Sequence, residues 1–371
     1  MTPDPSALPT PCLLLEEDRM TANIARLRSR LAPMGVALRP HLKTAKSLDV
    51  ARRLTDGPAT VSTLREAEEF AAGGVRDLVY GVGIAPAKLD RVLALRAQGV
   101  DLAVVLDSVD QARAVAATGA AIPALIEIDC DGHRSGLRPD EAEAILAVGR
   151  TLVDGGATLR GVLTHAGDSY AARGVAALEA CAEQERAGAV AAAAVLRQAG
   201  LPCPVVSVGS TPTAHFARDL TGVTEVRAGV FVFFDLVMAG IGVCSTDDIA
   251  LSVLTTVIGH RRDKGWIIVD AGWMAMSRDR GTAKQAVDQG YGLVCDAAGR
   301  PLDDLIVVDA NQEHGIVARR PGTAGDVPEL PVGTLLRILP NHACATGAQH
   351  DRYHVVGPDG VRAEWPRFRG W

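Results

Sequence analysis

Three side chains able to take part in chemistry each follow a short apolar run in the first half of the chain: Lys43, Arg134 and His165. A desolvated lysine amine among cationic neighbours can form an imine with an aldehyde. An arginine can hydrogen-bond a phenolate oxygen, and a histidine can lie against an aromatic ring. Taken alone, each is more often a solvated or structural residue, and Lys46 competes with Lys43 for the same role.

Two loops of small residues could cradle a phosphate group. Gly209–Thr211 lies at the expected start of a helix, where backbone N–H groups suit a phosphate dianion, and Gly229-Val230 offers a second set of amides. A Gly-Ser-Thr loop by itself is more often a plain turn. Together with the lysine, the arginine and the histidine, however, the two loops describe a pocket for pyridoxal phosphate bound to Lys43.

His342 and Cys344 form a separate constellation near the C-terminus. If the apolar run 335–339 is a strand that continues, both side chains point to the same face, because side chains alternate along a strand. An imidazole and a thiolate on one face can chelate Zn²⁺ and leave positions open for water or substrate. By itself H-x-C is a weak signal, and a packed cysteine beside a turn histidine is the commoner arrangement.

The strands and helices that must position these side chains can be recognised in the sequence. Short β-branched or apolar runs, typical of strands, alternate with longer stretches of helical spacing. Eight such units predict a parallel (β/α)₈ barrel of the TIM type, whose strands carry the chemistry at their C-terminal ends. The alternative is a doubly wound open sheet, but no G-x-G-x-x-G follows the first strand. The clearest helix covers 63–72, with Thr63 and Glu66 at capping-box spacing, and the longest runs from 175 to 199. The expected strands are 36–39, 59–62, 77–81, 101–106, 123–129, 159–164, 204–208 and 224–227.

After Asp235 the alternation stops, and short strands joined by turns predict a second, mostly β domain. We expect residues 16–238 to form the cofactor-binding barrel. Residues 239–371, together with 1–15, are expected to form the β domain that carries the metal site. The strands expected there are 250–258, 265–269, 304–308, 315–318, 334–338 and 353–356, with an opening strand at 12–15.

Composition narrows the class of protein. Of 371 residues 48% are hydrophobic, the formal net charge is -6, and no run of Lys or Arg suggests a nucleic-acid partner. The most apolar stretch, 229–244, contains Asp235 and falls short of the ~20 residues of a membrane span. Seven scattered cysteines, and an N-terminus without a basic and then apolar pattern, predict a cytoplasmic protein in a reducing compartment.

These motifs resemble the fold-type III pyridoxal-phosphate enzymes, which share the alanine-racemase-like barrel and β domain. Within that family the chain is similar to the metal-dependent branch containing D-serine dehydratase, D-threonine aldolase and D-threo-3-hydroxyaspartate dehydratase. The similarity is greatest to the 3-hydroxyaspartate dehydratases. The stretches that carry the resemblance are 39–44, 164–167, 205–213, 227–230, 269–281 and 338–348.

The resemblance implies a role for each residue in the cofactor site. Lys43 would be the Schiff-base lysine, Arg134 the partner of the phenolic oxygen and His165 the neighbour of the pyridine ring. No partner for the pyridine nitrogen is identified. The phosphate would be surrounded by Ser210, Thr211, Gly229 and Val230.

For the metal, the resemblance implies His342 and Cys344 as ligands, with zinc favoured and manganese, cobalt or magnesium as alternatives. Tyr170 is a candidate proton donor, with an ordinary hydrogen-bonding residue of the pocket wall as the alternative. Phe231 stands where relatives often carry a tyrosine, so a hydroxyl contact from that position is not expected. A homodimer is also implied.

The activity implied is a lyase that eliminates water from a β-hydroxy amino acid, such as 3-hydroxyaspartate or D-serine, to give a 2-oxo acid and ammonia. Lys43 would take the α-proton, and the metal would coordinate the β-hydroxyl. Aldolases of the family carry H-x-D, so Cys344 favours elimination over retro-aldol cleavage to glycine and an aldehyde. A third hypothesis is a cofactor carrier without turnover. Arg278 and Arg280 are candidate partners for a second substrate carboxylate.

Overall fold

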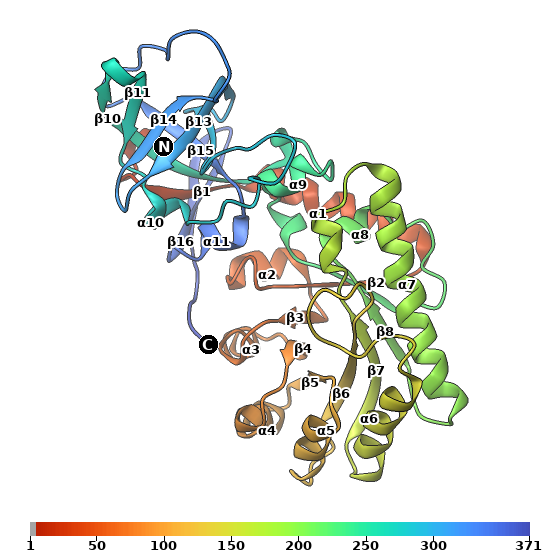
Figure 1. Ribbon diagram of the computed structural model, residues 1–371. Helices are drawn as coiled ribbons and strands as arrows, with labels where there is room; N and C mark the ends of the chain where they lie inside the picture. The colour runs from red at the N-terminus through yellow and green to blue at the C-terminus, as the bar shows by residue number, and fades with distance from the viewer. Residues whose placement is uncertain (1–4) are drawn as a thin grey trace. The chain divides into compact units, whose positions relative to one another are not determined.

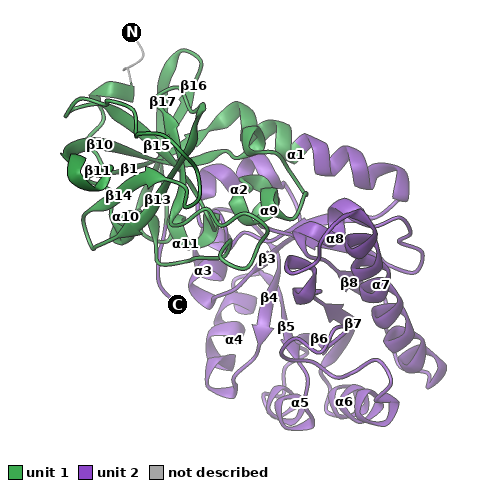
Figure 2. Cartoon of the chain, turned by 45° about the horizontal axis from the view of Figure 1, so that its top comes forward, with its two compact units in different colours: residues 1–24, 230–367 green, residues 25–229, 368–371 purple. Residues whose placement is uncertain are grey.

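The computed structural model describes residues 5–371 (Figure 1). The chain divides into two compact units, coloured separately in Figure 2. We call Ala25–Gly229 with Phe368–Trp371 the barrel unit, and the chain up to Ile24 with Val230–Arg367 the β unit.

These divisions differ from the expected boundaries at 15/16 and 238/239. The first half of helix α1 (Glu17–Leu31) groups with the β unit because its side chains are anchored there. Arg19 donates to the carbonyl oxygen of Ile249, and Asn23 donates to that of Asp248.

The barrel unit contains the predicted parallel barrel. Its eight strands lie in the order β2-β9-β8-β7-β6-β5-β4-β3, and a bridge between His41 and Thr60 closes the barrel between β2 and β3. The predicted fold class is thus confirmed, with helices outside the strands (Figure 1). The strands are β2 (Ala37–Pro40), β3 (Ala59–Val61), β4 (Asp77–Gly83), β5 (Asp101–Leu106), β6 (Pro123–Ile128), β7 (Thr158–Thr164), β8 (Val205–Val208) and β9 (Glu225–Ala228). The helices after α1 are α2 (Leu48–Leu54), α3 (Leu64–Ala72), α4 (Leu89–Ala97), α5 (Val109–Ala116), α6 (Ala142–Asp154), α7 (Val175–Gln198) and α8 (Thr211–Phe216).

The barrel strands form where the sequence offers nearly continuous apolar runs, because a parallel sheet is covered on both faces. All six residues of β6 are buried. One core cluster joins four adjacent strands through Val79, Ala103, Val105, Leu125 and Leu163.

Helix α3 begins at the predicted cap, but with half of the predicted capping box. The Thr63 side chain accepts the Glu66 N–H at 3.0 Å, whereas the Glu66 carboxylate accepts from the N–H of Ser62 instead of that of Thr63. The start of the helix is therefore fixed by its own sequence.

The β unit is built on a nine-stranded sheet of order β11-β14-β13-β12-β15-β10-β1-β16-β17. The opening strand β1 (Cys12–Glu16) pairs antiparallel with β10 and parallel with β16, which joins the N-terminus to this unit. Its other strands are β10 (Leu251–Arg261), β11 (Trp266–Val269), β12 (Gly292–Asp296), β13 (Pro301–Ala310), β14 (Gly315–Arg319), β15 (Leu335–Pro340), β16 (Arg352–Gly357) and β17 (Gly360–Pro366). Three short helices are α9 (Leu236–Gly240), α10 (Trp273–Met276) and α11 (Ala343–Gly347).

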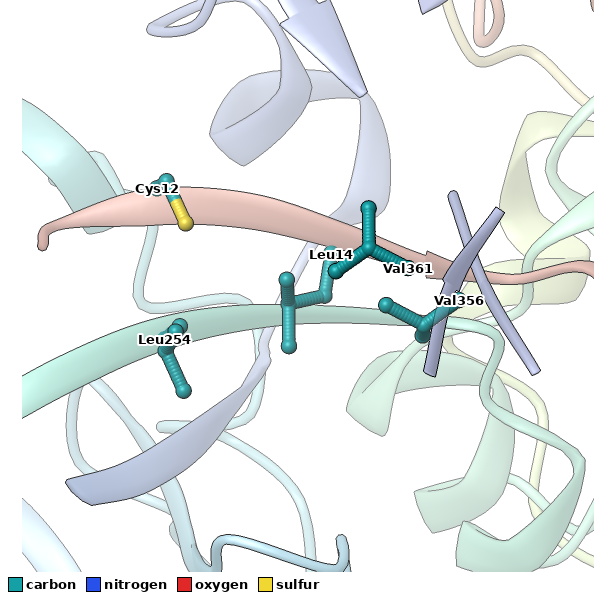
Figure 3. Packing of buried hydrophobic residues seen from close by; sticks show 5 residues of the cluster. All are labelled: Cys12, Leu14, Leu254, Val356 and Val361. Atoms are coloured by element: carbon teal, nitrogen blue, oxygen red, sulfur yellow. The ribbon is translucent and has the colours of Figure 1, made fainter. Parts of the chain in front are cut away.

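The core of the β unit gathers around β1 (Figure 3). Cys12 and Leu14 on β1 pack with Leu254 on β10 and with Val356 and Val361 near the turn between β16 and β17. This packing explains why β17, which the sequence analysis missed, forms in a stretch rich in charged residues. Its alternate residues are buried while the others face solvent.

Over residues 5–371, none of the helices combines the length and the apolar character that crossing a bilayer would require.

Candidate active site

The C-terminal ends of the barrel strands collect the predicted cofactor residues. All eight strands are parallel, so the residues that follow them lie at one rim. β2 leads into Lys43, β6 into Arg134 and β7 into His165. β8 leads into Ser210, and β9 into Gly229.

The two candidate lysines differ in what holds them. Lys43 lies in the turn at 42–45, and its side chain is exposed. The Lys46 ammonium instead pairs with the buried Glu66 carboxylate of α3 at 3.2 Å. Lys43 is therefore the amine available at the rim.

Two histidines beside Lys43 are held neutral. Burial and then the Lys43 charge keep the pKa of His41 well below its usual range. Burial, with added repulsion from neighbouring cations, lowers the pKa of His165 to about 3. The Nδ1 atom of His165 lies 2.9 Å from the backbone oxygen of Gly209, and because a carbonyl only accepts, the proton must be on Nδ1.

Arg134 is carried by a loop that is ordered by several carboxylates, of which Asp129 makes the most contacts. Asp129 Oδ1 accepts the backbone N–H groups of residues 131–133 at 2.7 to 3.3 Å. The Arg134 side chain is exposed, and its charge contributes, after burial, to the lowered pKa of His165. The arginine is thus within electrostatic reach of the imidazole.

The small-residue loop after β8 is bonded differently from the sequence expectation. The N–H of Gly209 donates to Glu185 at 2.9 Å, and that of Ser210 donates to Thr213 Oγ1 at 3.0 Å. The expectation that these two amides face a phosphate is therefore wrong, because α8 is capped by its own side chains. The Ser210 hydroxyl itself contacts Ser169 Oγ and Thr213 Oγ1, each at 2.9 Å, so a phosphate contact from Ser210 would have to replace one of these partners.

Gly229 allows a close approach at the end of β9. A Cβ atom at this position would lie 3.1 Å from the His41 backbone oxygen and 3.2 Å from Thr44 Oγ1. Glycine therefore keeps this backbone next to the turn that carries Lys43. Val230 follows at the start of the short 3₁₀ helix η5 (Val230–Val232).

Arg227 is a buried cation to which the sequence analysis assigned no role. Its guanidinium donates to Ser207 Oγ at 2.7 Å and to the Thr164 backbone oxygen at 2.5 Å. Burial lowers its pKa. Arg227 adds positive charge close to the two histidines.

Together, these groups fit pyridoxal phosphate. The rim offers an amine to join the aldehyde, arginines to compensate the anionic oxygens and a neutral ring to meet the heterocycle. Tyr170, in the 3₁₀ helix η4 (Gly167–Tyr170), lies with its ring 6.1 Å from that of His165 and tilted by 48°.

His342 and Cys344 follow β15 in the β unit, but they do not lie on a continuing strand. β15 ends at Pro340, and the short helix α11 begins at Ala343. The carboxylate of Asp235 accepts the Ala343 N–H at 3.0 Å and so fixes the turn. The expected strand-like alternation is wrong for this reason.

The two side chains nevertheless meet, and a carboxylate that the sequence analysis missed orients the imidazole. Asp279 Oδ2 lies 2.7 Å from His342 Nδ1. Burial lowers the pKa of His342, but its hydrogen bonds to Asp279 and Cys344 outweigh burial and raise the pKa to about 11. The groups around His342 therefore strongly favour a positive charge on its imidazole.

This donor set fits a metal ion. A carboxylate on Nδ1 leaves Nε2 for the metal, as is usual for histidine ligands. Across residues 5–371, no group of three or more His, Cys, Asp or Glu side chains is arranged to hold a metal ion. A metal bound to two protein ligands, His342 and Cys344, would keep positions open for water or substrate.

The two arginines beside Asp279 are not equivalent. Arg280 pairs with Asp288 at 2.9 Å and stacks on Tyr291. Arg278 is exposed and lies over the Trp273 ring, 4.4 Å from its centroid. Arg278 is thus the better candidate to receive an anion. Phe231 is fully buried and presents no polar group.

Comparison with known proteins shows the family. The profile of the family "Alanine racemase, N-terminal domain" matches residues 15–237, more than half of the chain. The chain belongs to the fold-type III pyridoxal-phosphate enzymes. The serine dehydratase domain of this family matches residues 250–356. The expected family is therefore confirmed.

Within the fold-type III family, D-threo-3-hydroxyaspartate dehydratase of Delftia sp. (strain HT23) is 58% identical over 373 residues, which cover 98% of each chain. Its solved structure has a TM-score of 0.97 at 56% identity, covering 99% of this chain and 100% of that one. A cysteine-to-alanine variant of D-threo-3-hydroxyaspartate dehydratase, solved in the metal-free form, also has a TM-score of 0.97 at 56% identity and covers 100% of both chains. A 3-hydroxy-D-aspartate aldolase of Paracoccus denitrificans (strain Pd 1222) is 30% identical over 384 residues, covering 98% of this chain and 92% of that one.

Proposed function

We propose that this protein is a lyase that uses pyridoxal phosphate and a divalent metal ion to eliminate water from a β-hydroxy amino acid. The substrate is 3-hydroxyaspartate, with D-serine as a second candidate, and the products are a 2-oxo acid and ammonia. The observation that carries the proposal is the exposed Lys43 amine at the barrel rim, beside the neutral His165 and the cationic Arg134. The 58% identity to a dehydratase selects elimination among the reactions of the family.

The barrel unit would bind the cofactor through its own residues. Lys43 would hold it through its amine, Arg134 would pair with the phenolic oxygen, and His165 would support the ring. When bound, pyridoxal phosphate withdraws electrons from the α-carbon of the amino acid and so acidifies the α-proton. Lys43 would be the base that takes this proton. The phosphate contacts would come from Ser210, Thr211, Gly229 and Val230.

In the β unit, His342 and Cys344 would hold the metal ion, and Asp279 would fix the imidazole. When bound, the ion acts as a Lewis acid on the β-hydroxyl, which is otherwise a poor leaving group. Nitrogen and sulfur donors favour zinc, with manganese, cobalt and magnesium as alternatives. A variant of the related D-threo-3-hydroxyaspartate dehydratase was solved in a metal-free form, which fits an enzyme family with a metal-bound state as well. Tyr170 would supply a proton from the barrel rim.

Arg278 would receive the second carboxylate of 3-hydroxyaspartate. It is exposed, and it directly precedes the metal-orienting Asp279. Within residues 5–371, no carboxylate pairs with it in the way that Asp288 pairs with Arg280. D-serine lacks this carboxylate, so Arg278 would contribute to selectivity between the two substrates.

The competing function is retro-aldol cleavage, and the aldolase relative at 30% identity is the observation in its favour. One incubation of the holoenzyme with D-threo-3-hydroxyaspartate separates the two. Elimination gives oxaloacetate and ammonia, whereas cleavage gives glycine and glyoxylate. We expect oxaloacetate and ammonia in equal amounts, with loss of both after treatment with a chelator. Glycine as the main product would show that the protein is an aldolase and not a dehydratase. Binding of the cofactor without any product would indicate a carrier protein.

We further propose a homodimer in a reducing, cytoplasmic compartment. The seven cysteines support the compartment, because they are an odd number scattered along the chain without the paired spacing of a disulfide framework. Light scattering coupled to size-exclusion chromatography would test the dimer, and a monomeric mass would contradict it.

A further inference from the structure

A buried carboxylate lies behind the rim, in a place where the mechanism does not use it. Glu185 stands in the middle of helix α7 and is 2% exposed. Its Oε1 atom accepts two backbone N–H groups, those of Ala166 and Gly209, both at 2.9 Å. The side chain of Thr213 is hydrogen-bonded to the same carboxyl group. Burial raises the pKa of Glu185, and these hydrogen bonds oppose the increase.

The two amides belong to the residues that determine how His165 is held. Ala166 follows His165 directly, and the Gly209 peptide accepts the His165 Nδ1–H through its carbonyl oxygen at 2.9 Å. One oxygen of Glu185 therefore fixes the backbone beside the imidazole and also the residue whose carbonyl sets the imidazole tautomer. The same residue, Gly209, opens the loop that holds Ser210.

No side chain is present at Gly209 to hold the orientation of this residue by packing. Its φ is 144°, and a Cβ atom would lie 1.9 Å from the Arg227 backbone oxygen, so no side chain is tolerated there. Because Gly209 has no side chain, its orientation depends on contacts of its backbone groups. The hydrogen bond from the Gly209 N–H to Glu185 is one of these contacts.

We propose that Glu185 is a positioning residue, which sets the Nδ1–H tautomer of His165 and the orientation of the loop 209–213 toward the cofactor. The inference rests on the proposed function, because it takes the rim as the site of pyridoxal phosphate. Glu185 acts through backbone groups and does not touch the reacting atoms.

Two substitutions separate positioning from charge. Glu185→Gln removes the charge but keeps an oxygen at the same reach, so both N–H groups stay bonded. Glu185→Asp keeps the charge but shortens the side chain by one methylene, so that it no longer reaches both amides. Leu196→Ala, at a fully buried position further along the same helix, controls for general loss of stability.

The first measurement is the His165 tautomer in the cofactor-free protein, by ¹⁵N NMR of the imidazole, with the signal assigned through its loss in His165→Asn. We expect the Nδ1–H form in the wild type, in Glu185→Gln and in Leu196→Ala, and a mixture of tautomers in Glu185→Asp. The second measurement is the Kd for pyridoxal phosphate, which should be about tenfold weaker in Glu185→Asp than in Glu185→Gln.

The proposal is overturned if Glu185→Asp retains the Nδ1–H form and the wild-type Kd. It is equally overturned if Glu185→Gln is impaired and Glu185→Asp is not, since charge would then be the property that matters. If the wild type itself fails to bind pyridoxal phosphate, the proposed function fails, while the tautomer measurement still decides the role of Glu185.

Discussion

At the scale of single residues, the choice between two lysines depends on which of them is already paired. Lys46 is held by Glu66 at 3.2 Å, whereas Lys43 is exposed at the rim. We expect Lys43→Ala to lose the visible absorbance of the cofactor imine and all turnover, because no other amine replaces it. Lys46→Ala should keep both. Spectra of the two variants after incubation with pyridoxal phosphate test this, and imine absorbance surviving in Lys43→Ala would transfer the role to Lys46.

A second residue-scale prediction concerns the imidazole ligand. Asp279 accepts from His342 Nδ1 at 2.7 Å, which orients the ring and makes Nε2 a better donor. Asp279→Asn should weaken binding of zinc by about 10- to 100-fold, the usual effect of removing such a partner. The measurement is zinc retained against a competing chelator. Asp288→Asn, which removes the charge that pairs with Arg280 but keeps an oxygen for the Gly290 N–H, is the matched control, and equal zinc retention in both variants would remove Asp279 from the site.

At the scale of elements, the loop between β6 and α6 carries Arg134, and the Asp129 carboxylate caps three of its backbone N–H groups. Asp129 Oδ1 orders residues 131–133, and a contact between His133 and Asp168 at 3.0 Å ties the loop to η4. Asp129→Ala should speed amide hydrogen exchange at 131–134 and weaken binding of pyridoxal phosphate about threefold, since part of the hydrogen-bond energy is lost. Asp110→Ala on the exposed start of α5 should change neither. Unchanged exchange would mean that the cap is redundant.

The elements also show what the sequence could and could not predict. The barrel strands were predicted within two residues at each end, because apolar runs in a parallel sheet are continuous and bounded by polar turns. Strand β17 was missed, since only Val361 and Trp365 of its seven residues are buried and two of the others, Arg362 and Glu364, are charged. Its formation depends on pairing with β16, which local sequence does not encode.

In the candidate site, too, residues marked by local sequence could be predicted, whereas residues that depend on distant partners could not. Lys43, Arg134 and His165 could be found because each follows a recognisable strand. Asp279 and Glu185 could not, because their partners lie 63 residues away in one case and 19 and 24 in the other. Nothing in the type or spacing of these acids separates them from solvated carboxylates on the surface.

At the scale of the whole molecule, the rim makes stability depend on pH. The pKa of His165 is lowered to about 3 in the folded chain, from an ordinary value of 6.5, and that of His41 is also well below 6.5. Between these values the unfolded chain binds protons that the folded chain does not. These two histidines therefore make the free energy of unfolding of the cofactor-free protein fall as the pH falls below 6.5, whereas the raised pKa of the buried Glu185 acts in the opposite direction.

Replacing His165 by a neutral residue isolates its contribution to the pH dependence of the unfolding free energy. His165→Asn keeps an N–H donor for the Gly209 carbonyl but cannot take up a proton in this pH range. Relative to the wild type, we expect its unfolding free energy, from urea titrations at pH 7, 6 and 5, to gain about 2 kcal/mol in total on acidification, with the larger part between pH 6 and 5. His133→Asn, at an exposed histidine, should follow the wild-type curve much more closely. Parallel curves for His165→Asn and the wild type would show that His165 protonates freely in the folded chain, and the rim would then not hold a neutral imidazole against the cofactor ring.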